Sequence, residues 1–497
     1  MRLMTNPDRA SLPAARAALL ATAMLGAALL SACSLAPTYK RPDAPVAAAF
    51  PADDTGKAAT TGSAPPAAAN QRDAVDTGWR EYFIEPRLQQ LIAAALENNR
   101  DLRTAALRIE EARALYNVQS ADRLPNLNAS VGATRAKTPG TVAPTGESTI
   151  GRRVDAGLSI SSFELDFFGR VKSLNDAALA AYLATDEARQ AAQISLVAQV
   201  AQAYFTERAY AEQYALAQQT YEARARTYKL TQQRAEVGAS SRLELRSNET
   251  LMETARASAL ALARQRAQAE NALTLLVGQP SATGAAAGTS AGAMPTDARI
   301  DALSAVPAGL PSDLLARRPD IRAAEQRLKS ANANIGAARA AFFPRISLTA
   351  AIGSTSPTLG GLFDSGTGSW SFAPQLVLPI FDAGRNRANL TLSEVRKNLA
   401  VADYEKTIQT AFREVADALA ARDYLGEQVA AQRAVQEAQA DRLKLSQLRF
   451  DNGVASSLDV LDAQRELFSA EQSLVQARLL RTTSAIDLYR ALGGGLK

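Results

Sequence analysis

The stretch Lys229-Leu230-Thr231-Gln232-Gln233-Arg234 recurs as Lys444-Leu445-Ser446-Gln447-Leu448-Arg449, at an offset of 215 residues. Gly169-Arg170 recurs as Gly384-Arg385 at the same offset. Two further glycine pairs keep it: Gly238 with Gly453, and Gly278 with Gly493. Because roughly 110 residues stay in register without a gap, the sequence predicts two copies of one structural unit.

The two predicted copies cover residues 86–278 and 312–493, and each is expected to run helix, strand, strand, long helix, short helix. No glycine or proline lies between Gly169 and Gly238, which predicts a helix of about 68 residues and roughly 100 Å. Residues 385–452 contain no proline and a single glycine, so a second helix of the same length is expected there.

Shorter helices are expected at residues 86–122 and 241–277, each about half as long as the helix it packs against. Apolar residues at i, i+3 and i+7 mark the packing seams of the long helices: Val197, Val200 and Tyr204 in the first copy, and Phe412, Val415 and Leu419 in the second. This spacing is typical of coiled-coil-like packing.

Segments that alternate apolar and polar residues lie at about 124–166 and 343–381, two in each copy. Segments of about ten residues with one apolar face are typical of transmembrane β-strands, although soluble hairpins give the same signal. A closed barrel requires about eight strands or more, so one chain cannot close it alone. Three copies would supply about 12 strands.

Composition argues against most catalytic chemistry. Histidine is absent and cysteine occurs once, so the usual ligands of zinc, haem and iron–sulfur sites and the bases of Ser-His and Cys-His catalysis are missing. We expect no enzyme, no cofactor and no metal site. The net charge of +5 is a small difference between 55 basic and 50 acidic residues, and no basic block indicates a nucleic-acid partner.

The N-terminus has the layout of a secretion signal over residues 1–32, with arginines followed by an apolar run. Leu30-Ser31-Ala32-Cys33 resembles a lipobox, and Cys33 is the only cysteine. We therefore expect Cys33 to become the lipidated N-terminus, with Ser34 favouring sorting to the outer membrane. Residues 33–85 are expected to begin as an extended tether, because residues 34–76 are rich in Ala, Pro, Thr and Gly and have no sustained period. Beyond the signal, no apolar run is long enough for a transmembrane helix.

The chain resembles the TolC/OprM family of trimeric outer-membrane efflux proteins, most closely its OprM-like lipoproteins. The resemblance covers essentially the whole mature chain. It rests on the lipobox and on five further stretches: Gly78–Phe83, Phe163–Arg170, Val306–Leu314, Ile335–Pro344 and Gly453–Ala463.

This resemblance implies a mainly α fold with a transmembrane β part. A homotrimer would form a 12-stranded barrel from four strands per chain, continuous with a long periplasmic α-helical barrel. An equatorial domain would be built partly from the N-terminal segment within residues 33–85, from residues 279–311 and from the C-terminal tail 494–497. The implied partners are outer-membrane lipid, a periplasmic adaptor and an inner-membrane RND-type transporter. The implied function is a passive exit duct for drugs or other small molecules.

The turns at 238–245 and 453–460 are expected at the periplasmic tip. Ser241 with Glu244, and Ser456 with Asp459, have the spacing of a helix capping box. By the resemblance, Asp459 and Asp462 would form acidic rings at a gated mouth, with a contribution from Glu244. The adaptor would dock on Gly238, Ser241, Leu243, Gly453, Ser456 and Leu458.

Two residues depart from TolC itself. Phe450 and Ala455 stand where a tyrosine and an arginine link its closed gate, so that latch is not expected here.

Other hypotheses remain open at this point. The same fold serves ducts for type I protein secretion or metal efflux. A different class of protein would be a lipid-anchored coiled-coil scaffold without a pore. An enzyme is the weakest alternative, because the acidic residues mostly occupy predicted helix surfaces and caps.

Overall fold

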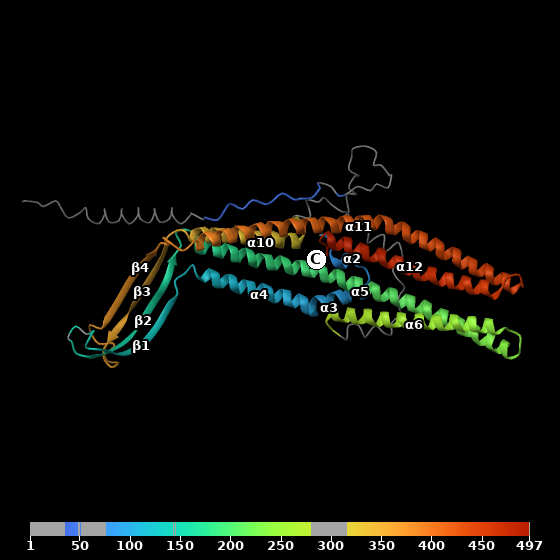
Figure 1. Ribbon diagram of the computed structural model, residues 1–497, viewed down its shortest axis with the longest axis horizontal. Helices are drawn as coiled ribbons and strands as arrows, with labels where there is room; N and C mark the ends of the chain where they lie inside the picture. Colours follow the sequence, from blue (N-terminus) through green and yellow to red (C-terminus); the bar gives the residue numbers. More distant parts are fainter. Residues whose placement is uncertain are drawn as a thin grey trace, which may run out of the picture. The chain divides into compact units, whose positions relative to one another are not determined.

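The computed structural model describes residues 35–47, 50, 76–142, 144, 146–279 and 316–496. They form two compact units (Figure 1). Of the described residues, the strand unit comprises those within 35–43, 109–185 and 324–404, and the hairpin unit comprises those within 44–108, 186–279, 316–323 and 405–496. The predicted signal, Cys33 and most of the predicted linker 279–311 lie outside the described residues.

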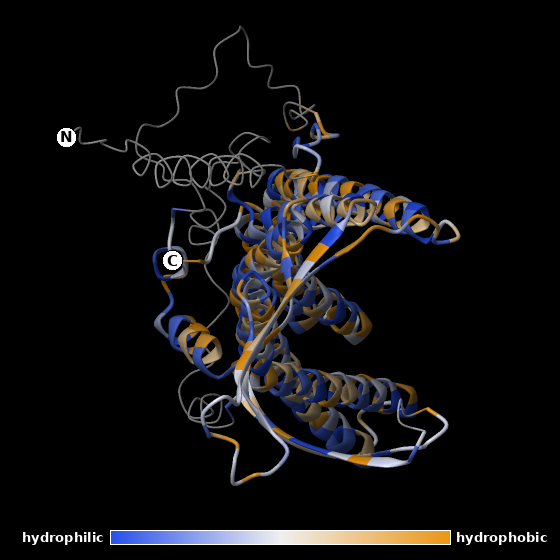
Figure 2. Ribbon diagram, turned by 90° about the vertical axis from the view of Figure 1, so that its left-hand side faces the viewer, coloured by the Kyte–Doolittle hydropathy of each residue, from blue (hydrophilic) through white to orange (hydrophobic). Residues whose placement is uncertain are grey.

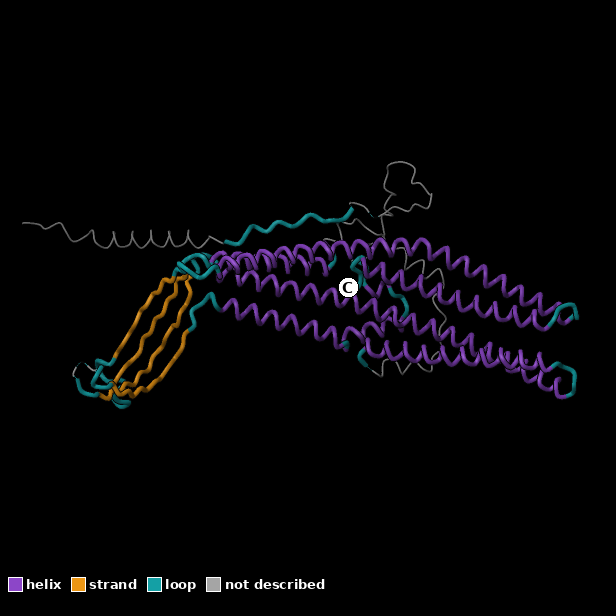
Figure 3. The backbone as a smooth tube through the Cα atoms, viewed as in Figure 1, coloured by secondary structure: helices purple, strands orange, loops and turns teal. Residues whose placement is uncertain are grey.

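The described elements follow one order twice (Figure 3). The first series is α2 (Trp79–Tyr82), α3 (Pro86–Asn98), α4 (Arg100–Ala121), β1 (Leu127–Thr138), β2 (Thr149–Leu165), α5 (Arg170–Glu236) and α6 (Arg242–Val277). The second is α10 (Pro319–Ala340), β3 (Arg345–Ser356), β4 (Gly368–Val377), α11 (Arg385–Asp451) and α12 (Ser457–Ala491). The two long helices have 67 residues each and start 215 residues apart.

The first predicted helix is interrupted, in contrast to the expectation of one helix over 86–122. Asn99 has an extended backbone between α3 and α4, and its side-chain Oδ1 accepts a hydrogen bond from the Leu102 backbone N–H at 2.9 Å. Asparagine is a favoured N-cap residue because its side chain satisfies a free backbone donor. Asn99 therefore starts a new helix, α4, within a sequence pattern that is helical on both sides, and this explains the break.

The four strands form one antiparallel sheet in the order β1-β2-β3-β4. Its register aligns the apolar positions of the alternating segments across all four strands: Ala129, Leu158, Ile352 and Trp370 form one row, and Leu127, Ile160, Ala350 and Phe372 the next. Hydrophobic and hydrophilic residues alternate along the strands (Figure 2). Trp370 is 79% exposed and Ile352 is 67% exposed, so this apolar face has no cover within the described chain.

The hairpin unit has its core where the seam predicts it. Val197, Val200 and Tyr204 are each at most 3% exposed, and Val415 is fully buried. Phe412 and Leu419 are only partly buried. At the end of α12, Tyr489 stacks on Tyr82 of α2 with ring centroids 3.9 Å apart, which joins the last helix of this unit to its first.

The residues after the lipobox were expected to be an extended tether. Residues 35–47 are described without helix or strand, and residues 35–41 are bound along α10. Part of the tether is therefore attached to the strand unit. No helix among the described residues is long and apolar enough to cross a membrane.

Candidate gate and docking tips

The turn between α11 and α12 is a capped helix start. Gly453 has a φ of 74°, a left-handed conformation that glycine adopts without steric cost. Ser456 Oγ accepts from the Asp459 N–H, and the Asp459 carboxylate accepts from the Ser456 N–H at 2.9 Å, so the capping box is complete. The second-copy turn thus has the structure that its spacing predicts.

The turn between α5 and α6 is capped on one side only. Gly238 has a φ of 76°, and Ser241 Oγ accepts from the Glu244 N–H at 3.1 Å. The Glu244 carboxylate accepts from Ser240 Oγ at 2.7 Å instead of returning to the Ser241 N–H. Glu244 therefore binds a neighbouring hydroxyl, in contrast to the reciprocal box expected here.

Asp459 is exposed and has no ion pair within the described residues. The backbone and side-chain hydrogen bonds from Ser456 hold the pKa of Asp459 below its usual value. Its carboxylate therefore stays charged at neutral pH, and its capping role accounts for its position.

Asp462 has a different environment. Arg442 of α11 contacts its Oδ2 at 3.1 Å, and Arg465 of α12 contacts its Oδ1 at 2.5 Å. Asp462 is thus held between two arginines. Sequence reasoning found this aspartate but missed both partners.

The missing signal lies in the comparison of the two copies. At the offset of 215, the first copy has Thr227, Ser247 and Thr250 in the places of Arg442, Asp462 and Arg465. The hydroxyls of all three bond backbone carbonyls of their own helices. The ion cluster is therefore a property of the second copy alone.

All six residues predicted to dock an adaptor are exposed at the two turns. Leu243 is 79% exposed and Leu458 is 68% exposed, and they occupy equivalent positions. Val237 and Val454 add further apolar surface at 79% and 68% exposure. Each turn thus presents uncovered apolar side chains beside a glycine.

A buried arginine was not predicted. Arg224 on α5 is 6% exposed, and its Nη1 donates to the Leu251 carbonyl of α6 at 3.1 Å. Its Nε and Nη2 have no hydrogen-bond partner among the described residues. Burial, together with the charge of Arg465, lowers the pKa of Arg224.

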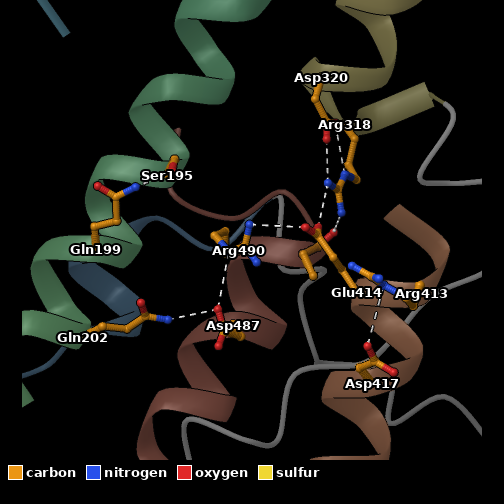
Figure 4. A network of polar contacts seen from close by, with 11 residues as sticks. Ser195, Gln199, Gln202, Arg318, Asp320, Arg413, Glu414, Asp417, Asp487 and Arg490 are labelled. Atoms are coloured by element: carbon orange, nitrogen blue, oxygen red, sulfur yellow. Dashed lines mark hydrogen bonds and ion pairs between the residues drawn. The ribbon is translucent and has the colours of Figure 1, made fainter. Parts of the chain in front are cut away.

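An ionic network lies at the end of α12 in the hairpin unit (Figure 4). Arg318, with a side chain 8% exposed, contacts Asp320 at 2.6 Å and Glu414 at 2.9 Å. Its Nη1 donates to the Ala491 carbonyl at 2.8 Å. Arg490 reaches Glu414 from α12 at 3.6 Å. The network joins the start of α10 and the end of α12 to the middle of α11.

The first copy makes the same carbonyl contact with a neutral side chain. Asn99 Nδ2 donates to the Leu276 carbonyl at 2.8 Å, and Leu276 precedes Ala491 by the repeat offset. Asparagine in one copy and arginine in the other thus hold equivalent helix ends.

No group of three or more histidine, cysteine or acidic side chains that could hold a metal ion occurs among the described residues. The arrangement at the turns offers charge and exposed apolar surface.

Comparison with known proteins also divides the chain into two copies. The sequence profile of the family "Outer membrane efflux protein" matches residues 91–279 and again 310–494. The antibiotic efflux pump outer membrane protein ArpC of Pseudomonas putida is 48% identical over 468 residues, 94% of this chain and 93% of the relative. The toluene efflux pump outer membrane protein TtgC of the same species has the same identity and coverage.

Solved structures show the same likeness. A membrane protein of Pseudomonas aeruginosa superimposes with a TM-score of 0.82 at 44% identity, covering 93% of this chain and all of that one.

Proposed function

The chain belongs to the outer membrane efflux protein family and is an outer-membrane exit duct of an efflux pump, and we propose that three copies form it. The observation that carries this proposal is a four-stranded sheet with two free edges, attached to two long helical hairpins, in a chain that matches efflux proteins along 94% of its length.

A trimer with a 12-stranded barrel would satisfy surfaces that one chain leaves open. Within the described residues β1 and β4 pair on one side only, and an unpaired edge exposes backbone donors and acceptors. In lipid such groups must be paired, which requires a closed barrel. α4 also has no buried residue in the single chain. Neighbouring copies would pair β1 with β4 and cover α4.

We propose a periplasmic adaptor and an inner-membrane RND-type transporter as partners, with small organic molecules as cargo. The relatives named for antibiotic and toluene efflux favour such cargo over a secreted protein. Deletion of the gene should increase susceptibility to antibiotics and organic solvents, and the intact gene should restore resistance. Unchanged susceptibility together with co-purification of a secretion adaptor would contradict this cargo.

We propose the turns of α5–α6 and α11–α12 as the adaptor-docking tips. The exposed Leu243 and Leu458 would supply the apolar contact. Leu243→Asp combined with Leu458→Asp should abolish co-purification of the adaptor. Leu230→Asp, at a position 56% exposed on α5, is the matched control and should leave co-purification unchanged.

We propose that Asp459 and Asp462 shape the electrostatics of the periplasmic mouth, with Glu244 in the first copy. Three chains would place three carboxylates at each position, an arrangement that favours cations. Since Asp462 is held by Arg442 and Arg465, Asp459 would supply most of the uncompensated charge.

Asparagine substitutions separate charge from capping, because an amide oxygen still accepts the Ser456 N–H. Asp459→Asn should weaken divalent-cation block of the conductance without unfolding the turn. Asp462→Asn should leave Arg442 without a counter-ion and Arg465 with Glu466 as its remaining partner, and should shift selectivity toward anions. Asp441→Asn on exposed α11 surface is the control, and equal behaviour of all three variants would contradict the acidic-ring proposal.

We propose Cys33 as the lipidation site. Leu35, the described residue nearest in sequence, accepts from Arg339 Nη1 at 3.4 Å, and Arg339 precedes β3 by a few residues. Leu35, two residues after Cys33 in the sequence, therefore lies near the strand end of α10. Intact-mass measurement should find an acylated N-terminal cysteine in the wild type and none in Cys33→Ser.

A further inference from the structure

We propose that one face of α10 is a binding site for the extended peptide that follows the lipidated cysteine, with Glu325 as its main fastening residue. We call this face the α10 stripe: Glu325, Lys329, Asn332, Gly336 and Arg339. Their spacing of i, i+4, i+7, i+11 and i+14 places them along one side of a helix. We call residues 35–41 the strap.

Glu325 receives three hydrogen bonds from the strap. Arg41 donates through Nε at 3.1 Å and through Nη2 at 2.7 Å, one to each carboxylate oxygen. Tyr39 Oη donates to Oε1 at 3.2 Å. A two-pronged guanidinium–carboxylate contact is among the strong and directional side-chain interactions in proteins.

The stripe continues toward the strands with backbone recognition. Asn332 Nδ2 donates to the Pro37 carbonyl at 2.7 Å. A Cβ at Gly336 would lie 2.5 Å from Ser173 Oγ and 2.8 Å from the Cα of Ala36, so glycine is what allows the strap and α5 to approach α10 this closely. The α10 stripe binds the strap through the backbone carbonyls of Leu35 and Pro37 and through the side chain of Arg41. Contacts at such spacing are typical of an extended peptide.

Exposure along the strap agrees with its contacts in part. Residues 35–37 and Tyr39 are partly covered, whereas Thr38, Lys40 and Arg41 are exposed. The side chain of Arg41 keeps 51% of its surface exposed although its guanidinium binds Glu325. The strap is therefore held on α10 by hydrogen bonds at four of its residues, Leu35, Pro37, Tyr39 and Arg41.

Charges around Glu325 favour its ionised form. Its side chain is 7% exposed, and Lys329 Nζ lies 3.4 Å from Oε1. Burial alone would raise the pKa of Glu325, but the hydrogen bond from Arg41, the charges of Lys329 and Arg41 and the bond from Tyr39 outweigh it and lower the pKa. Tyr404 of α11 also faces this group.

The consequence for the duct rests on the proposed lipidation of Cys33. A strap bound to α10 restricts where the acyl chains leave the protein. An unbound N-terminal peptide would let them sample a large volume. We infer that the α10 stripe holds the lipid anchor beside the strands while they insert.

Limited trypsin digestion of the full-length protein tests the seat directly. Lys40 supplies a cleavable bond within the strap, and Pro42 blocks cleavage after Arg41. Glu325→Gln and Arg41→Met should each raise the rate of cleavage after Lys40 about tenfold, the size expected for loss of a charge-assisted contact. The double variant should add little to either single one.

Glu394→Gln, an exposed acid on α11, is the matched control and should cleave at the wild-type rate. Circular dichroism of each variant checks that the helices are intact. Equal cleavage rates in wild type and Glu325→Gln, whether both fast or both slow, would overturn the proposal, because the strap would then be unseated or held without Glu325.

The link to the anchor has its own readout. In lipid vesicles, Glu325→Gln should slow the appearance of heat-resistant trimers in the Cys33 protein and have no such effect in a Cys33→Ser background. If the digestion rates are as expected but Cys33 carries no acyl group, the binding of the strap to α10 is supported and the proposed lipid anchor is contradicted. An equal Glu325→Gln effect in both backgrounds would contradict the role in anchoring.

Discussion

Arg318 and Asn99 make the same hydrogen bond in the two copies, one with a charged side chain and the other with a neutral one. Both donate to a carbonyl near the end of a hairpin's second helix, but only Arg318 adds buried ion pairs with Asp320 and Glu414. Removing one partner of a buried pair is costly because the remaining charge is left uncompensated. The second copy therefore depends on charge where the first does not.

Glu414→Ala should destabilise the protein by about 2–3 kcal/mol, less than a fully buried pair because Asp320 still holds Arg318. Gln199→Ala, at the equivalent position in the first copy, should have little effect, since Gln199 is exposed. The midpoint of thermal unfolding by circular dichroism measures both. A similar shift in the two variants would contradict the ionic role of Glu414.

Arg224 leads to the opposite expectation. Its guanidinium is nearly buried with two unpartnered nitrogens, and such a group costs free energy in the folded state. Arg224→Met keeps the apolar stem and should raise the unfolding midpoint by an amount equivalent to about 1 kcal/mol. Arg226→Met, on exposed α5 surface, is the control. A lower midpoint for Arg224→Met would show instead that the guanidinium of Arg224 stabilises the folded state.

The Glu325 contact sets a pH dependence. The folded-state pKa of Glu325 is lower than its ordinary value, so the stabilisation is present above that ordinary value and is lost as pH falls through the lower, folded one. Hydrogen exchange of the strap, corrected for intrinsic rates, should be unchanged between about pH 7 and pH 5. Increased exchange within that interval would contradict the assignment.

At the scale of the elements, the sheet depends on two facing glycines. Gly157 pairs with Gly353 across β2 and β3. A Cβ at Gly353 would lie 2.2 Å from the Ala156 carbonyl oxygen, closer than any real contact.

Gly353→Ala should separate β2 from β3 and abolish heat-resistant trimers on gels. Gly368→Ala, where a Cβ meets nothing within 4 Å, should assemble normally. Trimers of Gly353→Ala as heat-resistant as wild type would contradict the close approach of the two strands.

The sequence predicted these elements unevenly, for physical reasons. The long helices were predictable because neither contains a proline: α5 is a run of 67 residues without glycine, and α11, of the same length, contains one glycine. The strand faces were predictable because alternation sets the register that aligns Leu158 with Ile352. The break at Asn99 was missed because asparagine within a helical pattern is ambiguous between cap and surface residue.

The site was predicted less completely than the fold. Asp459 and Asp462 could be located from the resemblance and the capping spacing. Arg442 lies 20 residues from Asp462, so their contact depends on how α11 packs on α12. The strap contacts join residues 284 or more apart, and local pattern contains no information about such pairs.

The whole molecule that we propose is a trimer, because one chain leaves several surfaces open. Among the described residues, β1 and β4 each have a free edge, the apolar rows of the sheet are exposed and α4 has no buried residue. Other copies of the chain would cover these surfaces. Three copies would close a barrel of about 12 strands, wide enough for solutes.

Conductance of the purified protein in planar lipid bilayers tests whether three chains form a duct. We expect heat-resistant trimers to insert and conduct ions, and Asp459→Asn to weaken block by divalent cations. A protein that stays monomeric and leaves the bilayer non-conducting would contradict the duct.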